Sequence, residues 1–179
     1  LVIPRIGARD AQIAGLIALA APTRPFADLF LEQTIYLVNL DGTVTPEEQK
    51  LMDGIRQQTE VIKNATWDEL PADTLLLGTP ISYWQDLRGY NPAIAAQSLT
   101  QRLLILQGER DYQVTMTDFQ GWQTALGDRA NTTLKSYPQL NHLFISGTGT
   151  PSPAEYQVPS HVSETVIKDI ANWISNPLP

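Results

Sequence analysis

The chain has 179 residues, of which 42% are hydrophobic and 17% charged, and its formal net charge is −7. This profile is that of one globular domain able to bury a core, and the negative charge argues against nucleic acid or an anionic membrane surface as partner. The sequence has no cysteine and two histidines, which excludes disulfides, thiolate nucleophiles and Cys-based zinc sites and leaves little room for a His-rich metal site.

The first ten residues, LVIPRIGARD, have the character of the middle or end of a helix. They carry no initiator Met, basic segment or other signal-peptide feature. We therefore expect the sequence to start inside a domain. Residues Ile13–Pro22 follow as a continuous apolar run of strand length, which is typical of a parallel strand covered on both faces. No apolar run of the chain has the length of a membrane span.

Two helices are predicted next. The first covers about residues 24–40. The second has a well-formed start, with Thr45 as N-cap, Pro46 in the first position and Glu48 three residues after the cap. Both place apolar residues at helical spacing.

The stretch from Asn64 to Ser98 is rich in Pro, Gly, Trp and Tyr and shows no long periodic element. We interpret residues 24–98, approximately, as a cap inserted over the sheet within a single domain. Its aromatic residues either hold the cap onto the sheet, which we favour, or line a substrate pocket. They are Phe26, Phe30, Tyr36, Trp67, Tyr83, Trp84 and Tyr90.

Strand and helix then alternate again. We predict a strand over 102–107, a helix over 115–127, a strand over 132–136 and a closing helix over 163–175. This alternation is the signature of an α/β fold with a mostly parallel sheet. The closing helix is expected to bury its apolar residues Val166, Ile167, Ile170, Trp173 and Ile174.

An acidic residue follows the strand in LLILQGERDYQV. Asp111 comes directly after the tight turn that ends the apolar run, and chemistry in open α/β sheets collects beyond the carboxyl ends of the strands. Asp111 is therefore our candidate for the acid of a catalytic triad, with Glu109 as the alternative. An Asp at this place could also simply stabilise the turn through its own backbone.

A histidine follows the next predicted strand in LKSYPQLNHLF. His142 lies 31 residues after Asp111, a distance that fits one helix and one returning strand. The order acid, then histidine, is that of the second half of a Ser-Asp-His triad. His161, beside Pro159 and Ser160, is the competing candidate, although a role at a helix start accounts for it.

These two segments resemble the C-terminal part of an α/β-hydrolase, and more narrowly of a bacterial serine esterase or peptidase. Three further parts of the chain share the resemblance: the segment EYQVPSHV, the terminal amphipathic helix and the early segment IAGLIALAAPTRPFADLFLEQTIYL. The resemblance covers nearly the whole chain. It implies that Asp111 is the triad acid and His142 the triad base, that no cofactor or metal is required, and that the substrate is a small ester or amide.

One part of the family pattern is missing. The G-x-S-x-G nucleophile elbow occurs nowhere in these residues, and neither does an oxyanion-hole loop. Ser82, Ser98, Ser146 and Ser160 lack the strand–turn–helix setting that exposes a nucleophile. We therefore expect the serine to lie upstream of Leu1, in the N-terminal half of the same domain, and the 179 residues alone to be inactive.

The sequence thus predicts a carboxylic ester hydrolase that works through an acyl-enzyme. Three alternatives stay open. The parent protein could be a peptidase of the same fold. Its missing nucleophile could be an Asp, as in dehalogenase-like or epoxide-hydrolase-like enzymes. The chain could also be a non-catalytic binding module on a hydrolase scaffold.

Overall fold

The computed structural model describes residues 1–176, apart from the side chain of Asp68, and the chain divides into two compact units. The first unit combines Leu1–Thr23 with the chain from Asn91 onward, and the second is Arg24–Tyr90. The chain thus leaves the first unit after Thr23 and returns to it at Asn91. Each unit has a core of its own.

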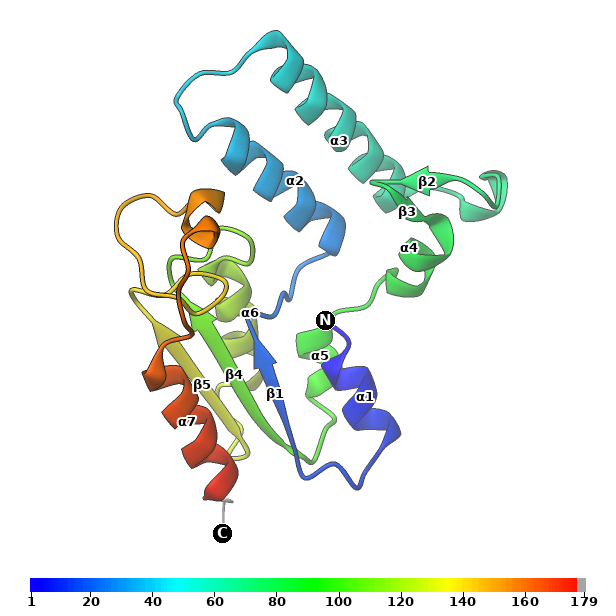
Figure 1. Ribbon diagram of the computed structural model, residues 1–179. Coiled ribbons are helices and arrows are strands. Elements are labelled where there is room, and N and C mark those ends of the chain that lie inside the picture. The colour runs from blue at the N-terminus through cyan, green and yellow to red at the C-terminus, as the bar shows by residue number, and fades with distance from the viewer. Residues whose placement is uncertain (177–179) are drawn as a thin grey trace. The chain divides into compact units, whose positions relative to one another are not determined.

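The first unit is built on a three-stranded parallel sheet (Figure 1). Its strands are β1 (Gly15–Leu19), β4 (Arg102–Gly108) and β5 (Thr132–Tyr137), in the order β1-β4-β5. In the register of the sheet, Ile105 lies between Ala18 of β1 and Leu134 of β5. The predicted α/β fold with a parallel sheet and flanking helices is confirmed.

Helices cover both faces of this sheet. They are α1 (Ile3–Arg9), α5 (Pro92–Ala96), α6 (Met116–Leu126) and α7 (Glu164–Ser175), with a short 3-10 helix η2 (Pro153–Gln157).

Successive residues of β4 alternate between the two faces, as the pleat requires. Leu103 and Ile105 pack into a cluster with α5 and α6, whereas Leu104 and Leu106 pack into a second cluster with α7. Burial on both faces explains the continuous apolar run of this strand. It also makes β4 a rigid mount for the turn that follows it.

Helix α7 corrects one expectation. Val166 is 1% exposed, but Ile167 and Ile174 are 54% and 59% exposed. Ile170 and Trp173 are partly buried and pack with Val166 against the sheet. The prediction that all five apolar residues are buried is wrong for Ile167 and Ile174, because a helix on a sheet buries only one stripe of its surface.

The second unit is largely helical. Its elements are α2 (Phe26–Val38), α3 (Pro46–Asn64), η1 (Trp67–Glu69), β2 (Leu75–Leu76), β3 (Thr79–Pro80) and α4 (Ile81–Leu87).

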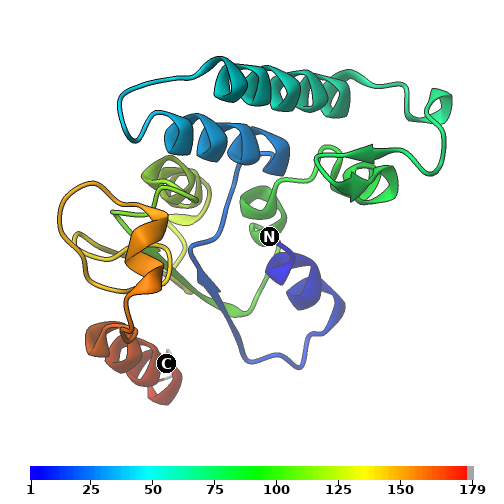
Figure 2. The same cartoon turned by 45° about the horizontal axis from the view of Figure 1, so that its top comes forward.

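Helices α2 and α3 run side by side in Figures 1 and 2. The predicted start of α3 is confirmed. The Thr45 side chain accepts a hydrogen bond from the Glu48 backbone, and the Glu48 carboxylate accepts one from the Thr45 backbone. Two donors that a helix leaves unpaired at its N-terminus are satisfied in this way.

The sequence of the stretch after α3 has no long periodic element. In the structure this stretch folds into a two-stranded antiparallel ribbon and short helices around an aromatic core. The Trp84 ring stacks on the Phe26 ring and lies edge-on to the Tyr83 ring. Its indole N–H donates a hydrogen bond to the Leu76 carbonyl at 2.9 Å. Trp67 and Trp84 are both buried inside the unit. Of residues 24–98, those from Asn91 onward, including α5, belong to the first unit.

Candidate active site

The turn after β4 buries a carboxylate. The side chain of Asp111 has no exposed surface, and its Oδ1 accepts hydrogen bonds from the backbone N–H groups of Gln113 at 2.8 Å and Val114 at 3.0 Å. These local bonds are the turn-stabilising role that an Asp commonly plays. They use only one of the two carboxylate oxygens, and the other faces different partners.

The second carboxylate oxygen of Asp111, Oδ2, accepts a hydrogen bond from a buried glutamine. Gln107 is 1% exposed, and its Nε2 donates to Asp111 Oδ2 at 3.2 Å and to the Val114 carbonyl at 2.8 Å. It therefore bridges the end of the strand to the far side of the turn. Gln107 was not among the residues predicted for the site. Its signal in the sequence is a polar side chain at the end of an otherwise apolar strand.

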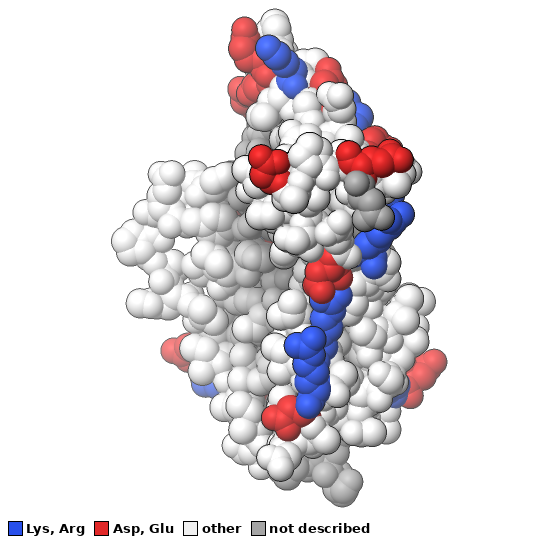
Figure 3. Space-filling view, turned by 90° about the vertical axis from the view of Figure 1, so that its right-hand side faces the viewer, with Lys and Arg blue, Asp and Glu red and all other residues white. Residues whose placement is uncertain are grey.

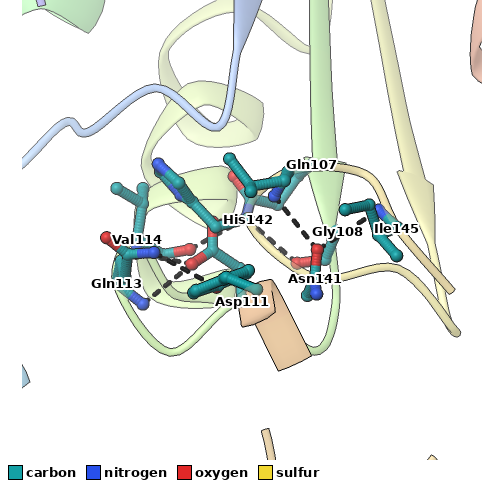
Figure 4. Close-up of polar contacts among 10 residues, drawn as sticks. Gln107, Gly108, Asp111, Gln113, Val114, Asn141, His142 and Ile145 are labelled. Carbon is teal, nitrogen blue, oxygen red and sulfur yellow. Dashed lines mark hydrogen bonds and ion pairs between the residues drawn. The ribbon is translucent and has the colours of Figure 1, made fainter. Parts of the chain in front are cut away.

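Asp111 Oδ2 also lies 2.8 Å from Nδ1 of His142 (Figure 4). Because an ionised carboxylate only accepts hydrogen bonds, and the other three partners of Asp111 are donors, Nδ1 carries the proton. When the ring is neutral, its acceptor is then Nε2. The His142 side chain is 27% exposed, so the ring is accessible and the acid beneath it is not.

Such a pair can act as a general base. A fixed carboxylate at Nδ1 holds the tautomer in which Nε2 accepts a proton, and it stabilises the imidazolium that results. The structure thus brings together Asp111 and His142, the two residues predicted for the site, from turns after neighbouring strands. Arg110 and Leu140 join these turns through a backbone hydrogen bond of 3.0 Å.

A buried asparagine shapes the histidine turn. Asn141 has no exposed surface, and its Oδ1 accepts from the backbone N–H groups of Leu143 at 3.1 Å and Ile145 at 3.2 Å. Phe144, within this turn, has a φ of +58°, which is uncommon for a bulky residue. The bonds to Asn141 span the strained segment and hold it in place.

A glycine allows the two turns to touch. A Cβ added to Gly108, the last residue of β4, would lie 2.4 Å from the Leu140 carbonyl oxygen and 2.6 Å from that of Asn141. Both contacts are with backbone, so no side chain can turn away to relieve them. The glycine lets the end of the strand pass directly against the turn that carries His142.

We expect Gly108→Ala to lower the free energy of unfolding by about 1–3 kcal/mol, because the backbone of one turn must move. Gly54→Ala on α3 is the matched control, since its added Cβ would meet nothing within 4 Å. That change should stabilise the protein by roughly 0.5–1 kcal/mol through helix propensity. Urea unfolding followed by circular dichroism measures both. Equal stability of Gly108→Ala and the parent would contradict the close approach.

The alternative candidates are not part of the Asp111–His142 pair. Glu109 is exposed and accepts a hydrogen bond from the Ser136 hydroxyl at 2.7 Å, and His161 is exposed between η2 and α7. Ser82 lies in α4, and Ser98 donates to the Ala95 carbonyl just after α5. Ser146 and Ser160 are exposed loop residues.

Residues 1–176 contain neither a group of three His, Asp or Glu side chains arranged to hold a metal ion nor a helix suited to crossing a membrane. On the face drawn in Figure 3, Lys and Arg side chains form a narrow stripe in the lower half of the view, with Asp or Glu side chains at both of its ends. The absence of a nucleic-acid partner stays a prediction from the overall charge.

The chain is similar to Esterase EstD of Thermotoga maritima, with 34% identical residues over 174 residues. The chain is homologous to a segment of an esterase. The similar segment covers 97% of this chain but 40% of that esterase, so the chain spans less than half the length of this relative. No family model matches the chain. The Asp111–His142 pair thus lies in a chain that is related to an esterase over part of the esterase's length.

Proposed function

We propose that the chain is the C-terminal part of an α/β-hydrolase domain of the serine esterase type and supplies two members of its catalytic triad. The hydrogen bond between His142 Nδ1 and the buried Asp111 carboxylate is the observation that carries this proposal. The parallel sheet and the homology to a segment of an esterase support it. The chain order, acid before histidine, is that of the α/β-hydrolases.

In this proposal a serine on a segment before Leu1 attacks the ester carbonyl. Nε2 of His142 takes the proton of the serine hydroxyl and then gives it to the leaving alcohol, which leaves an acyl-enzyme. Water attacks the acyl group next, and His142 acts again as base and then as acid. Asp111 holds the ring and stabilises its charged form. The reaction needs no cofactor or metal.

We further propose that the second unit, Arg24–Tyr90, is a cap of the hydrolase domain. It is inserted between β1 and α5, and its core is formed by its own residues.

A fluorophosphonate probe and a substrate panel test the function in the full-length protein. We expect the probe to label one serine outside these 179 residues, and p-nitrophenyl esters to be hydrolysed faster than aminoacyl amides. Peptide mapping of the labelled protein identifies the serine.

Other results would redirect the proposal. Faster cleavage of aminoacyl amides would indicate a peptidase. Hydrolysis without labelling, together with a covalent intermediate on an aspartate, would indicate the dehalogenase-like or epoxide-hydrolase-like chemistry. No label, no turnover and no stabilisation by any member of the panel would leave a non-catalytic role for the scaffold.

A further inference from the structure

A third segment contacts both turns of the candidate site. The 3-10 helix η2 lies beyond the carboxyl ends of β4 and β5 (Figure 1). The Tyr156 ring of η2 stacks on Tyr112, 6.4 Å between centroids, and its hydroxyl accepts from Gln113 Nε2 at 3.2 Å. Both partners follow Asp111 directly in the chain. Helix η2 is therefore attached to the turn that carries the acid.

Glu155 of η2 links this turn to the turn that carries the histidine. Its Oε1 forms an ion pair with the Arg110 guanidinium, and its Oε2 accepts from Asn141 Nδ2 at 2.9 Å. Arg110 immediately precedes Asp111, and Asn141 immediately precedes His142. One carboxylate thus connects the residues that come just before the acid and the histidine.

The contacts of Glu155 are partly withdrawn from solvent. Its side chain is 18% exposed and that of Arg110 is 13% exposed. Burial alone raises the pKa of Glu155, but the hydrogen bonds from Arg110 and Asn141 and the positive charge of Arg110 outweigh it, so the pKa is lowered. Glu155 is therefore ionised at neutral pH, and its charge is matched by Arg110.

Both polar atoms of the Asn141 side chain are engaged. Its Oδ1 holds the backbone of the histidine turn, and its Nδ2 donates to Glu155. The orientation of the Asn141 amide, and with it the shape of the turn that aims His142 at Asp111, depends on an acceptor at position 155.

A second glycine makes room for the ion pair. A Cβ on Gly147 would lie 2.1 Å from Arg110 Nη1 and 2.7 Å from Glu155 Oε1. Arg110 also donates to the carbonyls of Thr148 and Gly149, each at 3.3 Å. The loop after the histidine turn is therefore folded closely around the Arg110–Glu155 pair.

We propose that Glu155 is a positioning residue for His142, which it aligns with Asp111 through Asn141 and Arg110. This inference rests on the proposed hydrolase function. The polar contacts of Glu155 within residues 1–176 are with Arg110 and Asn141 and not with His142 or Asp111, so it sets the geometry of the pair and takes no part in proton transfer. The loss of such a support displaces the reacting groups without removing them.

Glu155→Gln in the full-length protein tests the inference, because the amide has a single acceptor oxygen and cannot accept from both Arg110 and Asn141 as the carboxylate does. We expect kcat for an ester to fall by about 10- to 100-fold, while KM stays within about twofold, since the affinity for substrate does not depend on the alignment of the base. Glu164→Gln is the matched control. It makes the same chemical change at an exposed carboxylate on α7 that pairs with Lys168 at 3.0 Å, and it should keep the parental kcat.

The Nδ1 proton resonance of His142 supplies a readout that does not need turnover. These 179 residues contain two histidines, His142 and His161. The His161→Gln variant removes the signal of His161 and so distinguishes it from the signal of His142. We expect this resonance to shift or broaden in Glu155→Gln and to stay unchanged in Glu164→Gln. Gly147→Ala, which crowds the ion pair and leaves Glu155 in place, should reproduce the lower kcat and the altered resonance, and it replaces Glu155→Gln if that variant does not fold.

Parental kcat and an unchanged resonance in either folded variant would overturn the positioning role. A rise of KM by about 10- to 100-fold with an unchanged kcat would also overturn it, because that result assigns Glu155 to substrate binding. If the parent protein hydrolyses nothing, the proposed function fails, and the resonance still decides whether Glu155 aligns the pair.

Discussion

His142→Ala in the full-length protein should lower kcat for ester hydrolysis by about 10⁶-fold, the cost of removing the histidine of a serine hydrolase triad. The reason is that the variant lacks the imidazole that the buried Asp111 carboxylate holds, which is the proposed acceptor of the nucleophile's proton. KM should change little, because the ring is needed for proton transfer more than for affinity. Steady-state kinetics with a p-nitrophenyl ester measures both constants.

His161→Ala is the control for this experiment. His161 is exposed and lies in the loop before α7, so its removal should leave kcat within about twofold of the parent, as for surface substitutions in general. Parental turnover in His142→Ala, or a large loss in His161→Ala, would show that the histidine has been assigned wrongly.

Asp111→Asn should lower kcat by about 10⁴-fold with the fold retained. The shape of the side chain is kept, and the backbone donors of Gln113 and Val114 still find an oxygen at Oδ1. The amide nitrogen would then face Nδ1 of His142 and favour the tautomer with the proton at Nε2. That tautomer cannot accept the proton of a serine.

Glu109→Gln makes the same change of carboxylate to amide two residues earlier in the turn. Its partner is the Ser136 hydroxyl and not His142, so its kcat should equal that of the parent. Kinetics and thermal melting of both variants separate an effect on the chemistry from an effect on folding. A fall in kcat for Glu109→Gln with a parental Asp111→Asn would transfer the role of acid to Glu109.

Much of the scaffold was predictable because its signals are local. The apolar run before Gln107 predicts a strand covered on both faces, and the Thr45–Glu48 spacing predicts the start of α3. Each follows from the preferences of a few neighbouring residues. The burial of Ile167 and Ile174 was mispredicted because periodicity shows that a helix has an apolar side, and not how much of it a neighbour covers.

The supports of the candidate site were not predictable in this way. Gln107 is a single polar residue at the end of a strand, and Glu155 stands in a loop rich in Gly, Pro and Ser. No local sequence pattern links Glu155 to Arg110, which is 45 residues away, or to Gly147, which makes room for their ion pair. Long-range contacts depend on how the elements pack. They produce no periodic pattern in the sequence, unlike helices and strands.

The longer strands and helices of the chain, the order of acid and histidine, and the expectation that both residues follow strands could all be predicted from the sequence. Two facts appear first in the folded chain: the side chains of Asp111 and His142 meet at 2.8 Å, and Gln107 donates a further hydrogen bond to the carboxylate. The physical reason lies in the parallel sheet. Pairing of β4 with β5 places their carboxyl ends side by side, and the turn residues become neighbours across 31 positions of sequence.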